Sequence, residues 1–401
     1  MFTAKSMMVS LLLALAGIAA PASAADKAVR LQAYEGGDAP ALSSKAALGR
    51  DLFMDANLSE PPGLACASCH SVSTAFSDAR QMRPTSGGSI PVLFGKRNAP
   101  SAMYAAFSPP FHYDAAEKVY VGGQFLDGRA ASLEEQAKGP LLSALEMGNT
   151  SKHQVVAKVR SAAYAGAFKE VFGPSSLDDP EIAFDRIANA IAAFERTPAF
   201  SRFTSKYDAY LAGKVRLSAR ESRGLKLFED KKKGNCAACH PSRPDERGAA
   251  PLFTDFTYDN LGVPKNPSND FYWMPGQFNP DGREFVDKGL GAVLQRDSEN
   301  GKFKVPTLRN IALTAPYMHN GYFKTLRGVV DFYNTRDRKP RCAQPVVSEA
   351  DALKHRCWPQ AEEAENVNDE ELGKLGLSAR EVDDIVAFLQ TLTDGWTAVA
   401  R

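Results

Sequence analysis

The sequence lacks an excess of charge of either sign. Its 401 residues contain 48 lysine and arginine side chains against 47 aspartate and glutamate side chains. Nucleic-acid-binding surfaces are usually basic, and long-range steering of an acidic partner needs a basic excess as well. The balance therefore argues against a nucleic-acid partner, while the length allows two or three domains of ordinary size.

Long hydrophobic runs are missing beyond the first two dozen residues. Lys5 precedes an apolar run over residues 7–20. The small residues Ala22-Ser23-Ala24 then form a pattern typical of a cleavage site. The run is short for a membrane span, so an uncleaved anchor is the weaker alternative. The pattern predicts a signal peptide over residues 1–24 and an exported chain with no membrane span after cleavage.

Cysteine and histidine are scarce, with six of each, yet four of the cysteines stand in one repeated pattern. The pattern is Cys66-Ala67-Ser68-Cys69-His70, and it returns as Cys236-Ala237-Ala238-Cys239-His240. Two thiols separated by two small residues can each add to a porphyrin vinyl group, and the histidine that follows can bind the iron. A redox pair or half a zinc site is the alternative for one Cys-x-x-Cys, but two complete copies are hard to obtain by chance. We therefore expect two covalently bound c-type haems.

The two remaining cysteines, Cys342 and Cys357, are best explained as a disulfide, because an exported chain folds in an oxidising compartment. The bond would close a loop of about 15 residues and contribute ~3 kcal/mol in the chain-entropy model. Copper or zinc binding by the pair is the alternative, with His355 as the one histidine at suitable spacing.

Helical signals flank both haem motifs. Capping residues or apolar spacing predict helices from residue 132 onward and within residues 43–53, 151–172, 181–196, 218–228 and 378–392. Residues 77–125 and 241–305 show little periodicity, and we expect ordered loops there that pack on the porphyrins. The predicted fold is mainly α with extensive loops, in two haem domains like those of c-type cytochromes. The domains are predicted at residues 25–203 and 204–401.

Longer motifs, spread over about residues 43–392, resemble the bacterial dihaem cytochrome c peroxidase and MauG family. Besides the two haem motifs, the matching segments are Arg97-Asn98-Ala99-Pro100, Asp127-Gly128-Arg129, Gln136 with Glu146-Met147-Gly148, and residues 304–310 running into residues 316–321. The resemblance implies a periplasmic enzyme whose first haem, on His70, reacts with H2O2.

The resemblance also implies which side chains handle the peroxide. Gln136 and Glu146, ten residues apart as in the family, would line the distal pocket of the first haem with Pro140 beside them. A carboxylate there can take a proton from one oxygen of H2O2 and return it to the departing oxygen, which favours O–O cleavage. Without the flanking motifs, Glu146 would be interpreted as a solvated carboxylate at a helix end.

The first haem is further expected to be open in the oxidised protein. Many cytochrome c peroxidases of the family carry a histidine in a Ser-Gly-Gly segment that blocks this iron until reduction. Here residues 85–90 contain Thr-Ser-Gly-Gly-Ser-Ile without histidine, and His112 lies in a different segment. An open first haem is typical of the MauG branch.

The second haem, on His240, is predicted to take Tyr333 as its other axial ligand. In the peroxidase branch a methionine lies fourteen residues beyond the histidine of the Pro-Tyr-x-His-x-Gly motif, and fourteen beyond His319 is Tyr333. A phenolate stabilises ferric and higher states, whereas methionine raises the potential. If Tyr333 is only a core aromatic, Met318 or Met274 is the alternative ligand.

A calcium ion is the third group that the resemblance implies. Asn98, with the backbone carbonyls of Thr314 and Pro316, matches the family's calcium site between the haem regions. Oxygen ligands from an amide and from carbonyls suit Ca2+. A turn-capping role is the alternative for Asn98.

One position departs from the family pattern. The family usually has tryptophan just before Asp-Gly-Arg, between the haems, where it relays charge; this chain has Leu126. Leucine cannot be oxidised, and Phe125 is a poor substitute. Tyr120 or Tyr104 could serve only if the fold brings them close.

The implied function is oxidation of a protein substrate by a MauG-like dihaem enzyme that uses H2O2 to form a high-valent haem. The alternative enzyme is a peroxidase that removes H2O2 with electrons from a small cytochrome c or cupredoxin. The non-enzyme alternative is a dihaem electron relay. An open first haem disfavours the relay and Tyr333 disfavours the detoxifying peroxidase, whereas Leu126 weakens the MauG-like interpretation.

Overall fold

The computed structural model describes residues 41–79 and 87–397, so the predicted signal peptide lies outside the described residues. The described chain is mainly helical, with long irregular segments and two small two-stranded sheets, which confirms the predicted fold class. In this part of the chain every helix is too short or too polar to cross a membrane.

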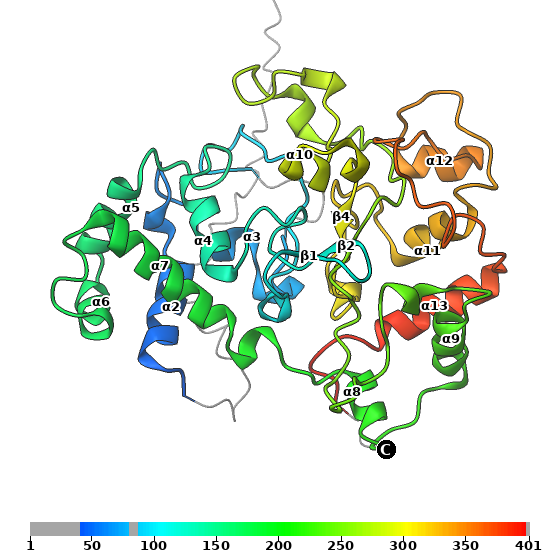
Figure 1. The fold of residues 1–401 in the computed structure, drawn as a ribbon, viewed down its shortest axis with the longest axis horizontal. Helices are drawn as coiled ribbons and strands as arrows, with labels where there is room; N and C mark the ends of the chain where they lie inside the picture. The colour runs from blue at the N-terminus through cyan, green and yellow to red at the C-terminus, as the bar shows by residue number, and fades with distance from the viewer. Residues whose placement is uncertain (1–40, 80–86, 398–401) are drawn as a thin grey trace, which may run out of the picture.

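The helices of the N-terminal half gather on one side of the molecule (Figure 1). They are α2 Ser44–Met54, α3 Cys66–Cys69, α4 Leu133–Leu142, α5 Lys152–Ser161, α6 Ala165–Phe172 and α7 Pro180–Glu195. One hydrophobic core, drawn from residues 48–200, lies among them. Serine hydroxyls cap the starts of α2, α4 and α5, as the sequence predicted at Ser132.

Most helices of the C-terminal half lie on the other side, while α10 lies near the middle (Figure 1). They are α8 Lys206–Leu211, α9 Ala219–Glu229, α10 Leu290–Leu294, α11 Leu326–Thr335, α12 Glu349–His355 and α13 Ala379–Gln390. A second core is drawn from residues 207–392. Capping boxes at Ser218 and Ser378 start α9 and α13 at the predicted positions.

Two short antiparallel sheets lie between the halves (Figure 1). Strands β1 His112–Asp114 and β2 Val119–Val121 form a hairpin in which Tyr113 pairs with Tyr120. Strands β3 Tyr258–Asp259 and β4 Phe303–Lys304 form the second sheet. These sheets belong to the segments that the sequence predicted as loops. They bring a segment of the N-terminal half and a segment of the C-terminal half next to each other.

The same helix crossing builds each half. α2 packs on α7, and α9 packs on α13. A Cβ atom added to Gly49 of α2 would lie 1.8 Å from the carbonyl oxygen of Ala190, and one added to Gly224 of α9 would lie 2.0 Å from that of Asp384. Glycine is therefore required at both crossings, because backbone touches backbone there. Each crossing fixes the helix that precedes a haem motif in the chain: α2 precedes the first motif, and α9 precedes the second.

A buried ion-pair network ties the two halves together. Nη1 of Arg97 lies 2.6 Å from Oδ2 of Asp127, and Nε lies 2.6 Å from Oδ2 of Asp287. Arg97 and Asp127 belong to the N-terminal half, whereas Asp287 lies 190 residues further along the chain. Burial alone would raise the pKa of Asp287, but the Arg97 guanidinium outweighs burial and holds that pKa well below its usual range.

Cys342 and Cys357 form a disulfide with a Cα–Cα distance of 5.0 Å. The bond lies beside α12, where the indole of Trp358 is fully buried. Among the described residues, no group of three or more His, Cys, Asp or Glu side chains could hold a metal ion. The copper or zinc alternative for this pair is therefore wrong.

Candidate functional site

The first haem motif begins as the short helix α3 and ends with a fixed histidine. Nδ1 of His70 lies 2.8 Å from the carbonyl oxygen of Phe76. A carbonyl oxygen only accepts a hydrogen bond, so Nδ1 carries the proton and Nε2 is left for a metal. Ala75 and Phe76 both have positive φ, at 52° and 54°, and this turn aims the carbonyl at the imidazole.

The second motif repeats this arrangement. Nδ1 of His240 lies 2.7 Å from the carbonyl oxygen of Phe253, which has a φ of 54°. Burial lowers the pKa of both His70 and His240, so each imidazole stays neutral near pH 7. A neutral imidazole with one nitrogen held and the other available is the form that binds haem iron.

The cysteines of the two motifs are not arranged as reactive thiolates. Burial raises the pKa of Cys66 to about 12 and that of Cys236 to about 12. Redox pairs and zinc sites need thiolates, whose pKa is lowered rather than raised. Together with the oriented histidines, these thiols fit covalent attachment of haem.

Glu195, at the end of α7, is a site residue that the sequence did not reveal. Its Oε2 atom is buried and makes no hydrogen bond within the described part of the protein. Burial raises the pKa of this carboxyl to about 8. In its ionised form the carboxylate raises the pKa of Cys66, which indicates that Glu195 lies near the first motif. An unbonded polar atom beside the first motif is consistent with a prosthetic group in this half, because buried polar atoms normally have a partner.

A cavity of about 600 Å³ opens beside the first motif. It is lined by Phe125, Arg129, Ala130, Ala131, Glu135, Gly139, Ser143 and Glu146. The charge of Glu146 also acts on Cys66, so this carboxylate is near the attachment point. The cavity therefore brings a carboxylate and a guanidinium together next to the predicted peroxide haem.

The environment of Glu146 raises its pKa. Burial is the main cause, while a hydrogen bond from Ser143 and the positive charge of Arg129 act in the opposite direction. A carboxyl with a raised pKa exchanges protons more readily near neutral pH, as a general acid or base must. The guanidinium carbon of Arg129 lies 3.5 Å from the ring centroid of Phe125. Nη1 of Arg129 lies 2.8 Å from Oδ1 of Asp127.

The other residues predicted around this pocket take different places. Gln136 lies on α4 and is partly buried, but its neighbour Glu135 is the residue that lines the cavity. Pro140 lies within α4, and its carbonyl accepts a hydrogen bond from the amide of Met147 at 3.2 Å.

The Ser-Gly-Gly segment passes directly beside Glu146. The amide of Ser89 donates to the carbonyl of Glu146 at 2.6 Å, and a Cβ on Gly88 would lie 2.4 Å from the carbonyl oxygen of Leu145. Thr85 and Ser86 lie outside the described residues. In its described part, this segment contacts the backbone of Leu145 and Glu146.

Tyr333 lies on α11 near the second motif. Burial raises the pKa of its phenol, and the charges of Cys236 and Cys239 add to the rise. Met274, one alternative ligand, belongs to a separate cluster, where its sulfur accepts a hydrogen bond from the amide of Phe94 at 3.4 Å. Met318 packs against the C-terminal core. The geometry thus keeps Tyr333 close to the second haem motif.

The predicted calcium residues are partly brought together. Nδ2 of Asn98 donates to the carbonyl of Pro316 at 2.6 Å, and the backbone amide of Asn98 donates to the carbonyl of His319 at 2.7 Å. Thr314 lies two residues before Pro316, and its hydroxyl donates to the carbonyl of Ile311. Rotating the Asn98 amide would turn its oxygen toward the Pro316 carbonyl, which is the arrangement that a cation needs.

Leu126 lies where the two halves meet. Its carbonyl accepts a hydrogen bond from the amide of Lys304 at 2.8 Å. Tyr104, one suggested substitute for the missing tryptophan, donates instead to Asp394 at 2.7 Å, and its ring packs on Phe203. Tyr120 lies on strand β2, in contact with other aromatic rings.

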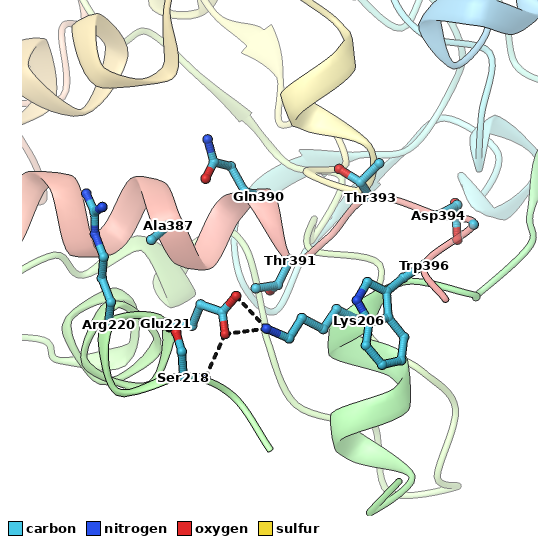
Figure 2. Close-up of a pocket in the computed structure, with 11 residues that line it drawn as sticks. Lys206, Ser218, Arg220, Glu221, Ala387, Gln390, Thr391, Thr393, Asp394 and Trp396 are labelled. Atoms are coloured by element: carbon cyan, nitrogen blue, oxygen red, sulfur yellow. Dashed lines mark hydrogen bonds and ion pairs between the residues drawn. The ribbon is translucent and has the colours of Figure 1, made fainter. Parts of the chain in front are cut away.

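A second cavity, of about 520 Å³, lies between α8, α9, α13 and the following chain (Figure 2). Its lining includes Trp396 and Arg220 but none of the predicted site residues. Nζ of Lys206 lies 2.6 Å from Oε2 of Glu221. Figure 2 marks this ion pair with dashed lines. Glu221 is held in this ion pair, and the lining contains no residue that the sequence assigned to the peroxide chemistry.

Known proteins resemble this chain in both sequence and structure. A family model described as di-haem cytochrome c peroxidase matches residues 43–216. The methylamine utilization protein MauG of Paracoccus denitrificans is 40% identical over 363 residues, covering 88% of this chain and 90% of that protein. Cytochrome c551 peroxidase of Pseudomonas aeruginosa is 33% identical over 312 residues, covering 77% of each protein. The solved diheme peroxidase BthA of Burkholderia thailandensis has a TM-score of 0.74 at 34% identity, covering 88% of this chain and 86% of that chain.

Proposed function

The chain belongs to the di-haem cytochrome c peroxidase and MauG family, and from this membership we propose how its two halves divide the work. It is a dihaem peroxidase that acts on H2O2. We assign the peroxide site to residues 25–203 and the electron-transfer site to residues 204–401. We place the enzyme in the periplasm, on the basis of the predicted signal peptide over residues 1–24.

The peroxide chemistry is assigned to the cavity that holds Glu146. When bound there, haem iron supplies the electrons that cleave the O–O bond. Glu146 takes the proton from one oxygen of H2O2 and returns it to the other, so that water rather than hydroxide leaves. Arg129 supplies positive charge where negative charge develops. Gln136, on the same helix as the cavity-lining Glu135, is proposed to orient the peroxide by hydrogen bonding.

The observation that carries this assignment is the cavity with Glu146 at the motif of His70, where no described histidine of the chain lies in the lining. A ferric haem held only by His70 would be high-spin, whereas a second protein ligand, as proposed for the haem on His240, would favour the low-spin state. Low-temperature EPR of the ferric protein is expected to show one high-spin and one low-spin haem. Two low-spin signals would contradict the open site.

The second haem is proposed to be held by His240 and Tyr333. Tyr333→Met is expected to raise the reduction potential of this haem, because thioether ligation favours ferrous iron more than phenolate ligation does. Spectroelectrochemistry of the variant measures the change. The matched control is Met318→Leu, which removes the alternative ligand and should leave the potential unchanged. An unchanged potential in Tyr333→Met, or a shifted one in Met318→Leu, would rule out Tyr333.

We propose that the substrate is a protein whose aromatic side chain is oxidised at a distance, as in the MauG-like branch. The support is the open cavity and the position of Tyr333. A small cytochrome c or cupredoxin that delivers electrons is the second candidate partner, and Leu126 favours it because leucine cannot relay charge between the haems.

We also propose a calcium ion bound by Asn98 and by the carbonyls of Thr314 and Pro316. The close approach of Asn98 to Pro316 supports it. Metal analysis of the purified protein is expected to find about one Ca2+ per chain, and Asn98→Ala should lower that content. Equal calcium in both proteins would remove Asn98 from the site.

A further inference from the structure

A series of four aromatic rings leads from the surface to the place where the two halves meet. We name Tyr113, Tyr120, Phe111 and Tyr258 the aromatic ladder. Leu126, which lies where the two halves meet, has a side chain that cannot be oxidised. We propose that the aromatic ladder carries electrons inward from a protein donor, with Tyr113 as the residue that the donor reduces. This inference rests on the proposed function and names its surface of contact.

The outer end of the ladder is the β1–β2 hairpin. Tyr113 is 50% exposed, which makes it one of the most accessible aromatic side chains among the described residues. It faces Tyr120 directly across the hairpin, and the two ring centroids are 5.0 Å apart. Nη1 of Arg296 donates to the hydroxyl oxygen of Tyr120 at 2.6 Å, which fixes this second ring.

The middle of the ladder is a close stack. The rings of Tyr120 and Phe111 are nearly parallel, at 2°, with centroids 5.5 Å apart. Phe111 then meets Tyr258 edge-on, with centroids 5.9 Å apart. Phenylalanine is too hard to oxidise to hold a charge itself. Its ring instead fills the gap through which an electron passes between the two tyrosines.

The inner end lies against the segment that contains Leu126. The hydroxyl of Tyr258 would be 2.3 Å from a Cβ on Gly128, and it donates to the carbonyl of Gly122. Tyr258 is buried, and it lies three residues after Asp255, whose amide donates to the carbonyl of Cys239 at 3.0 Å. The ladder therefore reaches both the segment that contains Leu126 and, three residues before Tyr258, the irregular segment that contacts the second haem motif.

The electron count is that of the peroxidase reaction. Each H2O2 takes up two electrons and two protons to become two molecules of water. In each of two passes, Tyr113 gives one electron inward to Tyr120 and releases its phenolic proton to solvent. A donor side chain then returns one electron to Tyr113, which recovers a proton from solvent. The donor that fits is an oxidisable side chain on the surface of another protein, because it only needs to contact the hairpin.

Two other exposed aromatics could be oxidised instead. Trp273 is 64% exposed and stacks with Arg283 at 4.4 Å, but no aromatic ring among the described residues continues inward from it. Tyr210 is 37% exposed and leads through Tyr207, at 5.7 Å, toward Phe253. That series ends at Phe253, whose carbonyl holds His240, and does not reach the segment that contains Leu126, so the aromatic ladder is the better candidate.

The test maps where oxidation emerges. The full-length protein with both haems is treated with H2O2 in the presence of a radical spin trap and without a donor, and mass spectrometry locates the covalent adduct. The main adduct is expected on Tyr113. In Tyr113→Phe the amount of adduct at residue 113 should fall at least tenfold. Tyr120→Phe should lower the adduct on Tyr113 several-fold, although Tyr113 itself is still present and exposed. Tyr210→Phe, the matched control, should leave it unchanged.

The outcomes separate the ladder from the peroxidase activity. Two outcomes would overturn the aromatic ladder if H2O2 is still consumed normally. One is an adduct on Tyr210 or Trp273, and the other is labelling of Tyr113 that Tyr120→Phe does not change. Either outcome would leave the assignment as a peroxidase intact. A protein with both haems that does not react with H2O2 would overturn the proposed function itself. Equal haem spectra in all variants confirm that they are folded.

Discussion

Glu146→Gln is expected to slow the reaction with H2O2 by about 10²–10⁴-fold while both haems stay attached, a loss of roughly 3–5 kcal/mol of transition-state stabilisation. The amide keeps the size of the side chain but cannot accept the peroxide proton. Stopped-flow mixing of the ferric protein with H2O2 measures the rate. The matched control is Glu135→Gln, which changes the other carboxylate of the same cavity and should stay within a few-fold of wild type.

The pH dependence gives a second readout for Glu146. The carboxylate must be ionised to accept the first proton, and its pKa is raised in the protein. The wild-type rate should therefore fall as the pH drops through this raised pKa, and Glu146→Gln should lack that limb. A rate near wild type in Glu146→Gln, or a retained acidic limb, would remove Glu146 from the mechanism.

Arg97→Met is expected to destabilise the fold by about 3–5 kcal/mol, because it removes the closest counter-charge from two buried carboxylates. Asp127 then keeps only the half-exposed Arg129, and Asp287 keeps only Lys96 at 4.0 Å. Arg97 bridges Asp127 and Asp287, and both carboxylates are buried. Denaturant unfolding followed by circular dichroism measures the loss. Arg129→Met is the matched control: it removes an arginine from the same Asp127, but its side chain is 45% exposed, so about 1 kcal/mol or less is expected.

The sign of the pH effect follows from the depressed pKa values of the two carboxyls. Their contribution to stability is fully present above the pKa of an unfolded aspartate, about 4, and is lost as the pH falls through the folded-state pKa. The gap between wild type and Arg97→Met should thus be widest at neutral pH and shrink below about pH 4. Replacing both aspartates by asparagine in Arg97→Met should recover part of the loss. A gap below 1 kcal/mol at neutral pH would contradict this role.

Much of the local structure was predictable from the sequence. The caps at Ser132, Ser218 and Ser378 marked real helix starts, since a serine hydroxyl bonds the free amides of a first turn. The stretch 151–172 was predicted as one set of helical positions, but it forms α5 and α6 with a break at residues 162–164. Periodicity survives such a break and does not reveal it.

Helix α11 was not predicted, although it carries Tyr333. Its sequence contains Gly328, two adjacent valines and a terminal threonine, all weak helix formers. The helix packs on α13, and Gly328 faces the start of α12, where an added Cβ would lie 2.0 Å from Oε1 of Glu349. Tertiary contact outweighs local preference in this helix, and local preference is all that a single sequence displays.

The geometry of the site was the least predictable part. The haem motifs named His70 and His240, but not the carbonyls of Phe76 and Phe253 that orient them. Those carbonyls depend on positive φ at phenylalanine, which has no local sequence signal. The pairing of Arg97 with Asp287 spans 190 residues and depends on how the halves dock.

The glycine crossings have a consequence for how such a molecule diversifies. At Gly49 and Gly224 the spacing of the two helices is fixed by main chain against main chain, not by the chemistry of any side chain. The helix spacing in each half therefore does not depend on which side chains face the prosthetic group. Under the proposed function, two halves built on the same kind of crossing can differ in chemistry at a few positions, such as Glu146 and Tyr333, while the helix spacing of each half stays the same.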